Sequence, residues 1–136
     1  MVVDASVAVK WYVPEKHYEK AIKLRNNYIK NTIKLLAPNL ILYEVANALR
    51  FHRIYKLDSN TIASAVKSLK DFGITRELSE EEWKIAINLS LEKNISIYDA
   101  VYVAVAKKEK ATLITSDKTL YETLKNIVST LLLENY

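Results

Sequence analysis

The chain of 136 residues has no cysteine, one glycine, two prolines and two histidines. Without cysteine it can form neither a disulfide nor a thiolate metal site, and two histidines exclude a three-histidine zinc site. So few glycines and prolines argue against an all-β fold with many tight turns and against disordered linkers. No apolar run approaches the ~20 residues that a membrane-spanning helix needs, so we expect no membrane partner.

The residues that are present are typical of a globular protein. Half are hydrophobic and 26% are charged, as in ordinary soluble proteins, and the length predicts one domain over residues 1–136. The net charge of +4 fits a polyanionic partner, although many proteins without such a partner are equally basic. Because the first expected strand begins at residue 2, we expect no signal peptide and a cytoplasmic location.

Apolar spacing and turn residues divide the chain into alternating strands and helices. The expected strands are residues 2–3, 33–37, 74–78, 111–115 and 127–133. The expected helices are residues 6–13, 17–30, 40–55, 59–72, 79–93, 97–108 and 119–125. The expected helix ends are an N-cap at Asn39, another at Asp58 or Ser59, a capping box of Ser79 with Glu82, and a C-terminal end at Gly73. Residues 97–108 also show strand-like alternation of valines, but the alanines and a Ser96–Asp99 capping pattern favour a buried helix. The alternation indicates an α/β domain with a parallel sheet, in which the helical pair of residues 40–73 forms a small lobe.

Four of the 16 acidic residues stand in unusual places. Asp4 and Asp117 each end a strand-like run, and both should lie at the same edge of a parallel sheet, where ligands bind. Glu44 has only uncharged residues one turn away and shares its helix face with Asn47, so we expect that face to be covered. Asp99 opens the most apolar helix, where a carboxylate must be paired, hydrogen-bonded or metal-bound.

Each acid also has a structural explanation. Asp4, Asp99 and Asp117 could simply cap helices or turns, whereas no nearby cation accounts for Glu44. Taken together, four carboxylates meeting at one sheet edge would repel one another unless a cation neutralised them or some were protonated. Oxygen ligands of this kind suit Mg²⁺ or Mn²⁺, ions that activate water and stabilise charge on a phosphoryl group.

In its ordered motifs the chain resembles the PIN-domain family, and within it the VapC-type ribonuclease toxins of prokaryotic toxin–antitoxin pairs. The family pattern has an acid with a hydroxyl or amide two residues on, a Glu with an Asn three residues later, a Tyr-Asp-Ala helix start, and a strand ending in Thr-x-Asp. The matching residues here are Asp4 with Ser6, Glu44 with Asn47, Tyr98-Asp99-Ala100, and Thr115-Ser116-Asp117. The order covers nearly the whole chain and is fairly specific, although each motif alone is weak.

The resemblance implies a three-layer α/β/α fold with a central parallel five-stranded sheet, and metal-dependent endoribonuclease activity. The resemblance also assigns residue roles. Asp4, Glu44, Asp99 and Asp117 would hold Mg²⁺ or Mn²⁺, and Ser6, Asn47, Thr115 and Ser116 would orient ligands or water. It further implies RNA as substrate, a homodimer, and a cognate antitoxin that blocks the site.

One position departs from the family pattern. Some relatives have a further acid just after the Thr-x-Asp motif, where this chain has Lys118. We therefore expect one well-held ion, with a second bound only alongside substrate. Lys10 and Lys118 lie near the expected site in sequence, but ordinary surface positions explain them equally well. Trp11 and Tyr12 are expected to pack rather than to stack on bases.

Three other readings compete with a toxin nuclease. Phosphoryl transfer through an aspartyl phosphate is disfavoured, because Ser6 stands where an Asp-x-Asp motif would need its second acid. A non-catalytic RNA- or protein-binding module with a PIN-like fold would be expected to lose acids, and this chain keeps all four. A housekeeping RNA-processing nuclease would use the same site, so the sequence leaves it open.

Overall fold

The computed structural model describes all 136 residues and contains five short strands. They are β1 (Val2–Val3), β2 (Ala37–Pro38), β3 (Thr75–Arg76), β4 (Leu113–Thr115) and β5 (Thr130–Leu132). All pairs are parallel, with β1-β4-β5 as one sheet and β2-β3 as a second. A parallel bridge between Val2 and Leu36 joins the two sheets, so the expected central parallel sheet is present but is divided.

The sheet is divided at β2, a strand whose end was predicted wrongly from the sequence. Residues 33–37 were expected to form a strand ending before Pro38, but β2 includes Pro38. The Ala37 amide donates to the carbonyl of Ile74, just before β3, at 2.8 Å, and the Asn39 amide donates to the carbonyl of Arg76 in β3 at 2.9 Å. Because successive N–H groups of a strand point to opposite sides, the nitrogen of Pro38 faces β1, where the ladder stops after Leu36. The missing N–H of proline therefore falls where no partner is needed.

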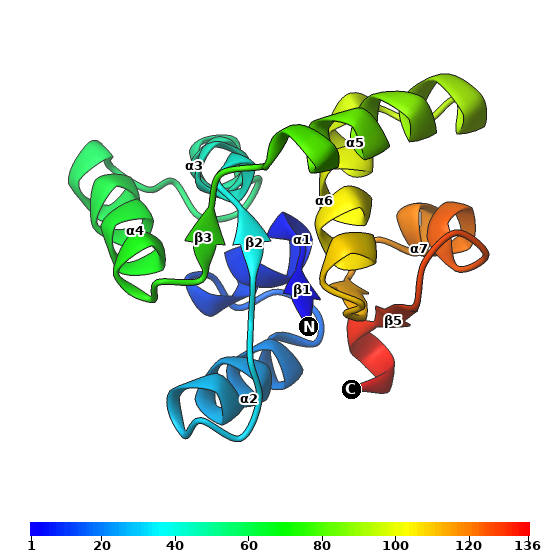
Figure 1. The fold of residues 1–136 in the computed structure, drawn as a ribbon. Helices are drawn as coiled ribbons and strands as arrows, with labels where there is room; N and C mark the ends of the chain where they lie inside the picture. Colours follow the sequence, from blue (N-terminus) through cyan, green and yellow to red (C-terminus); the bar gives the residue numbers. More distant parts are fainter.

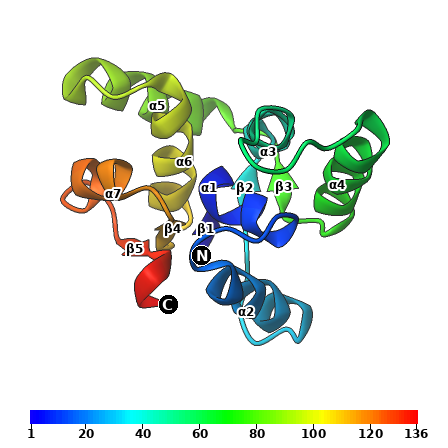
Figure 2. The same ribbon diagram turned by 180° about the vertical axis from the view of Figure 1, so that it is seen from behind.

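Helices cover both sides of the strands (Figures 1 and 2). They are α1 (Ala5–Ala8), the 3₁₀ turn η1 (Val9–Trp11), α2 (Tyr18–Ile29), α3 (Leu40–Arg50), α4 (Ser59–Asp71), α5 (Glu80–Lys93), α6 (Ile97–Lys108), α7 (Lys118–Leu124) and the 3₁₀ turn η2 (Leu133–Asn135). Helix α6 packs on β1, β2 and β4 from one side, and α1 packs on β4 from the other. Helices α5 and α6 pack together, as do α3 and α4. The layers are those of the expected α/β/α fold.

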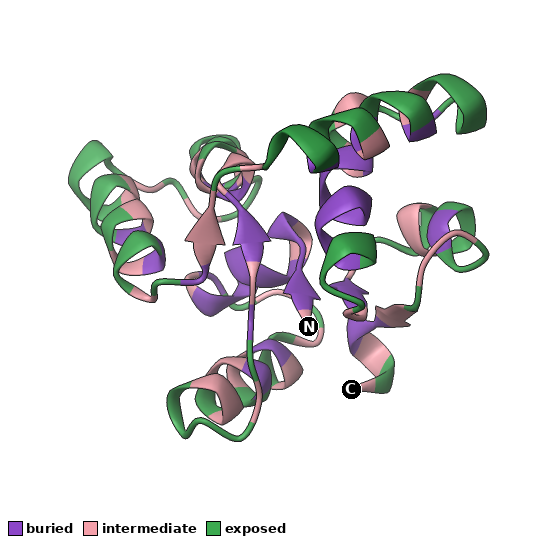
Figure 3. Ribbon diagram, in the orientation of Figure 1, coloured by how far each residue is buried: buried purple, intermediate pink, exposed green.

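Local sequence signals fix most helix ends. Ser79 and Glu82 form the expected capping box of α5. Asp58 accepts the Thr61 amide at the start of α4, and Gly73 follows that helix with φ of +68°, a conformation that suits glycine. Residues 97–108 are a helix, as predicted, and every residue from 100 to 106 is buried (Figure 3).

Two expected features around α3 are wrong. Asn39 does not cap the helix, because its amide donates to Glu77 Oε1 at 2.6 Å. The helix stops at Arg50 rather than at Tyr55. Just beyond it, His52 Nδ1 accepts the amides of Ile54 and Tyr55, at 3.3 and 3.1 Å. A side chain that takes these amides competes with the helical hydrogen bonds.

The apolar side chains form one core cluster of 32 buried residues, with members from both sheets and from α1 to α7. Trp11 belongs to it, as predicted: its indole N–H donates to the Ala21 carbonyl at 3.0 Å, and its ring meets Phe72 edge to face at 5.5 Å. Tyr12 packs against the same core. None of the helices has the length and apolar character required to cross a bilayer.

Candidate functional site

Asp4 lies at the carboxyl end of β1 and is buried, with only 7% of its surface exposed. It does not cap α1 with its side chain. Instead, Asp4 Oδ2 accepts hydrogen bonds from the hydroxyls of Ser6 at 2.6 Å and Thr115 at 2.7 Å. Pairing of β1 with β4 brings Thr115 next to Asp4. The chain therefore uses two hydroxyls to hold a buried carboxylate at the edge of the sheet.

The hydroxyls around Asp4 also fix the turn after β4. Ser6 Oγ accepts the amide of Ser116 at 2.9 Å, and Thr115 Oγ1 accepts the amide of Asp117 at 3.1 Å. These bonds tie the first acidic motif to the last one, although more than 100 residues separate them in the sequence. Ser6, Thr115 and Ser116, which the resemblance assigned to supporting roles, thus form one network around Asp4.

Glu44 reaches the site from α3 and is half-buried. Its Oε2 accepts a short hydrogen bond from the Tyr102 hydroxyl on α6. The expectation that its helix face is covered is only partly met. The covered line of α3 is Ile41, Val45 and Leu49, whereas Asn47 is exposed and its side chain hydrogen-bonds to none of the acids.

The electrostatics couple three of the acids. Burial raises the pKa of Asp4, the Ser6 and Thr115 hydroxyls oppose that rise, and the charge of Asp99 adds to it. Burial also raises the pKa of Glu44 to about 7, against the Tyr102 hydrogen bond and with help from the negative charges of Asp4 and Asp99. No cation acts on either carboxyl group. The site therefore concentrates negative charge without a basic partner.

Asp99 and Asp117 are the other two of the four predicted acids. Asp99 Oδ2 accepts the hydroxyl of Ser96 at 2.7 Å, while the Asp99 amide donates to the same Ser96 oxygen at 3.0 Å. Asp117 is exposed and caps α7, with Oδ1 accepting the amide of Leu120 at 3.0 Å. Both aspartates line one surface pocket of about 260 Å³. Asp99 thus shares a pocket with the exposed Asp117 and acts electrostatically on Asp4 and Glu44.

The acidic side chains of the site are candidate ligands for a divalent cation. No three acidic or histidine side chains lie close enough together to chelate one ion in this conformation. The hydroxyl donors nevertheless reach only one oxygen of each inner carboxylate, namely Asp4 Oδ2, Glu44 Oε2 and Asp99 Oδ2. The second oxygen of each has no side-chain donor. Carboxylate oxygens with excess negative charge are ligands suited to Mg²⁺ or Mn²⁺, so the residue types and charge fit such an ion.

Two supporting side chains were not identified from the sequence. Tyr102 was counted only as part of an apolar helix, yet its hydroxyl orients Glu44. The available signal was its spacing, because Tyr102 follows Asp99 by three residues and so lies on the same helix face. Ser96 was predicted as a cap, but its hydroxyl also holds the Asp99 carboxylate.

Comparisons with known proteins identify the family and the fold of the chain. The family model described as "PIN domain" matches residues 1–125. A curated relative from Pyrobaculum aerophilum, "Ribonuclease VapC3", is 33% identical over 132 residues, covering 95% of this chain and 98% of the relative. "Exonuclease VapC9" of the same organism is 30% identical, covering 93% and 86%. A toxin–antitoxin complex from Klebsiella pneumoniae contains a similar fold, with a TM-score of 0.63, 12% identity and coverage of 96% and 94%.

Proposed function

Because the chain belongs to the PIN-domain family, we propose that it is a metal-dependent endoribonuclease, the toxin of a VapBC-type toxin–antitoxin pair. The observation that carries this proposal is the coupled set Asp4, Glu44 and Asp99, in which burial and like charge raise the pKa of two members and no cation compensates. The relatives named as a VapC ribonuclease and a VapC exonuclease support nuclease chemistry.

The proposed ion is Mg²⁺ or Mn²⁺, held by Asp4, Glu44, Asp99 and Asp117. When bound, it supplies positive charge at the phosphoryl group and makes water more acidic. We propose one well-held ion, because only Asp4, Glu44 and Asp99 are electrostatically coupled, whereas Asp117 caps α7. A second ion would need ligands from the substrate.

The chain's own residues place the carboxylates for this role. Ser6 and Thr115 fix Asp4, Tyr102 fixes Glu44, and Ser96 fixes Asp99, in each case through hydroxyls that leave the other carboxylate oxygen without a side-chain donor. Partners that orient ligands in this way are typical of metal sites. Ser116 supports Asp4 through the Ser6 hydroxyl. Asn47 is proposed to act only on substrate or water, because it is exposed on α3.

The proposal extends to partners and location. An antitoxin partner is supported by the similar fold within a toxin–antitoxin complex, and a homodimer by the family resemblance. We propose that the protein acts in the cytoplasm, where its RNA substrate would be found. One relative carries the name exonuclease, so the choice of internal cleavage over trimming from an end has to be tested directly.

The test uses two single-stranded RNAs of the same mixed sequence, one linear and end-labelled, the other closed into a circle. Each is incubated with Mg²⁺, Mn²⁺ or EDTA, using the wild-type chain and Asp99→Asn. We expect metal-dependent cutting of both RNAs, lost in the variant. Cutting of the linear RNA alone would make the protein an exonuclease. Metal-dependent RNA binding without cutting would favour a non-catalytic module.

A further inference from the structure

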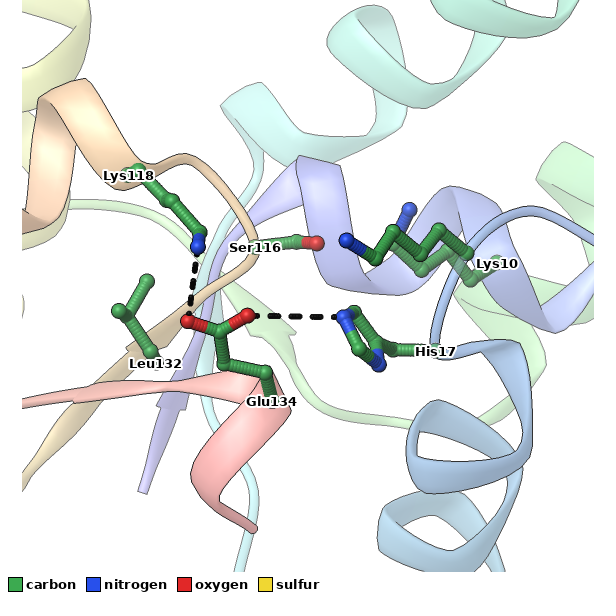
Figure 4. A pocket seen from close by; sticks show the side chains of 7 residues that line it. Lys10, His17, Ser116, Lys118, Leu132 and Glu134 are labelled. Atoms are coloured by element: carbon green, nitrogen blue, oxygen red, sulfur yellow. Dashed lines mark ion pairs between the residues drawn. The ribbon is translucent and has the colours of Figure 1, made fainter.

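A second pocket, of about 230 Å³, lies beside the acidic site and is basic. Four separate segments line it: Lys10 from η1, Lys16 and His17 from the loop before α2, Ser116 and Lys118 at the start of α7, and Leu132 and Glu134 at the C-terminal end. Figure 4 shows Lys118 and His17 on opposite sides of the Glu134 carboxylate, with Lys10 and Ser116 facing the same space.

The charges of this pocket favour an anion. Three lysines and His17 face a single carboxylate, that of Glu134. Lys10 is the unexpected member, because only 8% of its side chain is exposed and Glu15 holds its amine at 2.7 Å. Of the two positions that the sequence left open for Lys10, the ordinary surface position is therefore excluded. Glu15 is the paired anion that a lysine this deeply buried needs, so Lys10 adds a hydrogen-bond donor to the pocket but little net charge.

The carboxylate of Glu134 already lies between the basic side chains of this pocket. One carboxylate oxygen lies 3.0 Å from Lys118 Nζ, and the other lies 3.5 Å from His17 Nε2. The latter distance is too long for a good hydrogen bond, and His17 Nε2 is a buried nitrogen without a hydrogen-bond partner. A phosphate group in the place of this carboxylate could contact both Lys118 Nζ and His17 Nε2.

Glu134 is held in place from the other side. Leu133 is fully buried, and the backbone carbonyl of Glu134 accepts the Lys20 amine at 2.5 Å. Its position is therefore set by the fold. The carboxylate is the only acidic group among the lining residues, so it stands where a competing anion would bind.

The basic pocket and the acidic site meet at residues 115–118. Ser116 and Lys118 line the basic pocket, whereas Asp117 between them lines the pocket that it shares with Asp99. The Ser116 amide is bonded to Ser6, which in turn bonds Asp4. A nucleic-acid strand that reaches the carboxylates would therefore bring a neighbouring phosphate to the basic pocket.

We propose that the pocket formed by Lys10, Lys16, His17 and Lys118 binds a phosphate group of the RNA strand, and that Glu134 competes with it for the same cations. This inference rests on the proposed ribonuclease function, because it takes RNA as the ligand. The phosphate is either an internal diester, with two charged oxygens, or a terminal monoester, with three, and both accept charge-assisted hydrogen bonds from lysine.

The test measures binding of a fluorescent single-stranded RNA by anisotropy in EDTA, where the ion needed for cleavage is removed, over a series of NaCl concentrations. Lys118→Gln should weaken binding several-fold and flatten the dependence of log K on log salt by about 0.7, the loss of one phosphate contact on a single strand. Glu134→Gln should tighten binding several-fold. Lys84→Gln, at an exposed lysine on α5, is the matched control and should bind as wild type.

RNAs with phosphorylated ends and with hydroxyl ends distinguish a terminal from an internal phosphate. If the Glu134→Gln gain requires a 5′- or 3′-terminal phosphate, the pocket holds a terminal monoester; an equal gain with hydroxyl ends assigns an internal diester. Thermal melts check that each variant folds. Unchanged affinity and salt dependence in both Lys118→Gln and Glu134→Gln would overturn the inference, even if wild type cuts RNA. If these variants shift binding while wild type never cuts RNA, the pocket stands and the nuclease proposal fails.

Discussion

Replacing Glu44 by glutamine should stabilise the protein at alkaline pH when divalent ions are absent. In the fold, burial and the charges of Asp4 and Asp99 raise the pKa of Glu44 from its ordinary value of 4.5 to about 7. The folded state therefore binds this proton more tightly than the unfolded state does, so ionisation of Glu44 opposes folding as pH rises from 4.5 through 7. Glutamine stays neutral and can still accept the Tyr102 hydroxyl.

The size of the effect follows from the pKa difference. A rise from 4.5 to about 7 corresponds to about 3 kcal/mol against folding once Glu44 is ionised. Because the side chain is only half-buried, solvent screening reduces the expected gain to about 1–2 kcal/mol at pH 8. The gain should shrink toward zero as pH falls below 4.5, where Glu44 is protonated in both states.

The assay is urea unfolding in EDTA at pH 8 and pH 5, followed by circular dichroism. Glu92→Gln is the control, since Glu92 is exposed on α5 and forms no ion pair. Glu44→Gln should exceed wild type in unfolding free energy by more at pH 8 than at pH 5, and Glu92→Gln should not. A Glu44→Gln protein no more stable than wild type at pH 8 would refute the claim that this carboxylate is held at an electrostatic cost.

Three further predictions follow from contacts in the fold. Tyr102→Phe removes the hydroxyl that lowers the pKa of Glu44, so an NMR titration of the Glu44 carboxyl in EDTA should move above about 7; an unmoved midpoint would remove Tyr102 from the site. Arg76 lowers the pKa of the buried Glu82 to about 2, so this pair stabilises the fold above pH 4.5 and loses its effect as pH falls toward 2. Glu82→Gln should therefore reduce the pH dependence of the unfolding free energy between pH 4.5 and 2, and an unchanged pH dependence would contradict the pairing. Leu49→Ala, at a fully buried position on α3, should cost about 2–5 kcal/mol of unfolding free energy in urea, and a loss below 1 kcal/mol would mean that α3 is not part of the main core.

Local signals in the sequence predicted much of this fold because they act within a few residues. The capping box at Ser79, the Asp58 cap and Gly73 each work through the neighbouring backbone, and each appears in the structure as expected. Helix α6 could be identified because alanine content and the cap at Ser96 outweighed the alternating valines.

Features that depend on distant partners were not predictable in this way. The strand through Pro38 exists because the amides on either side of it donate to the carbonyls of Ile74 and Arg76, which no local pattern in the sequence predicts. The hydrogen bond from Tyr102 to Glu44 joins residues 58 positions apart. The sequence left an ordinary surface position open for Lys10, and its burial depends on Glu15 and on the packing of a loop. The acids themselves stood out because carboxylates in apolar stretches are costly, but their arrangement depends on how the strands and helices pack.

The most direct test of the account is the binding of Mn²⁺ itself, followed by the loss of its free EPR signal on titration with protein at pH 8. We expect one well-held ion per wild-type chain, with affinity weakened at least tenfold by Asp4→Asn and by Asp99→Asn and unchanged by Glu92→Gln. Mn²⁺ binding that both aspartate variants leave intact, or a wild-type chain that binds no Mn²⁺, would contradict the proposal that these carboxylates form the metal centre.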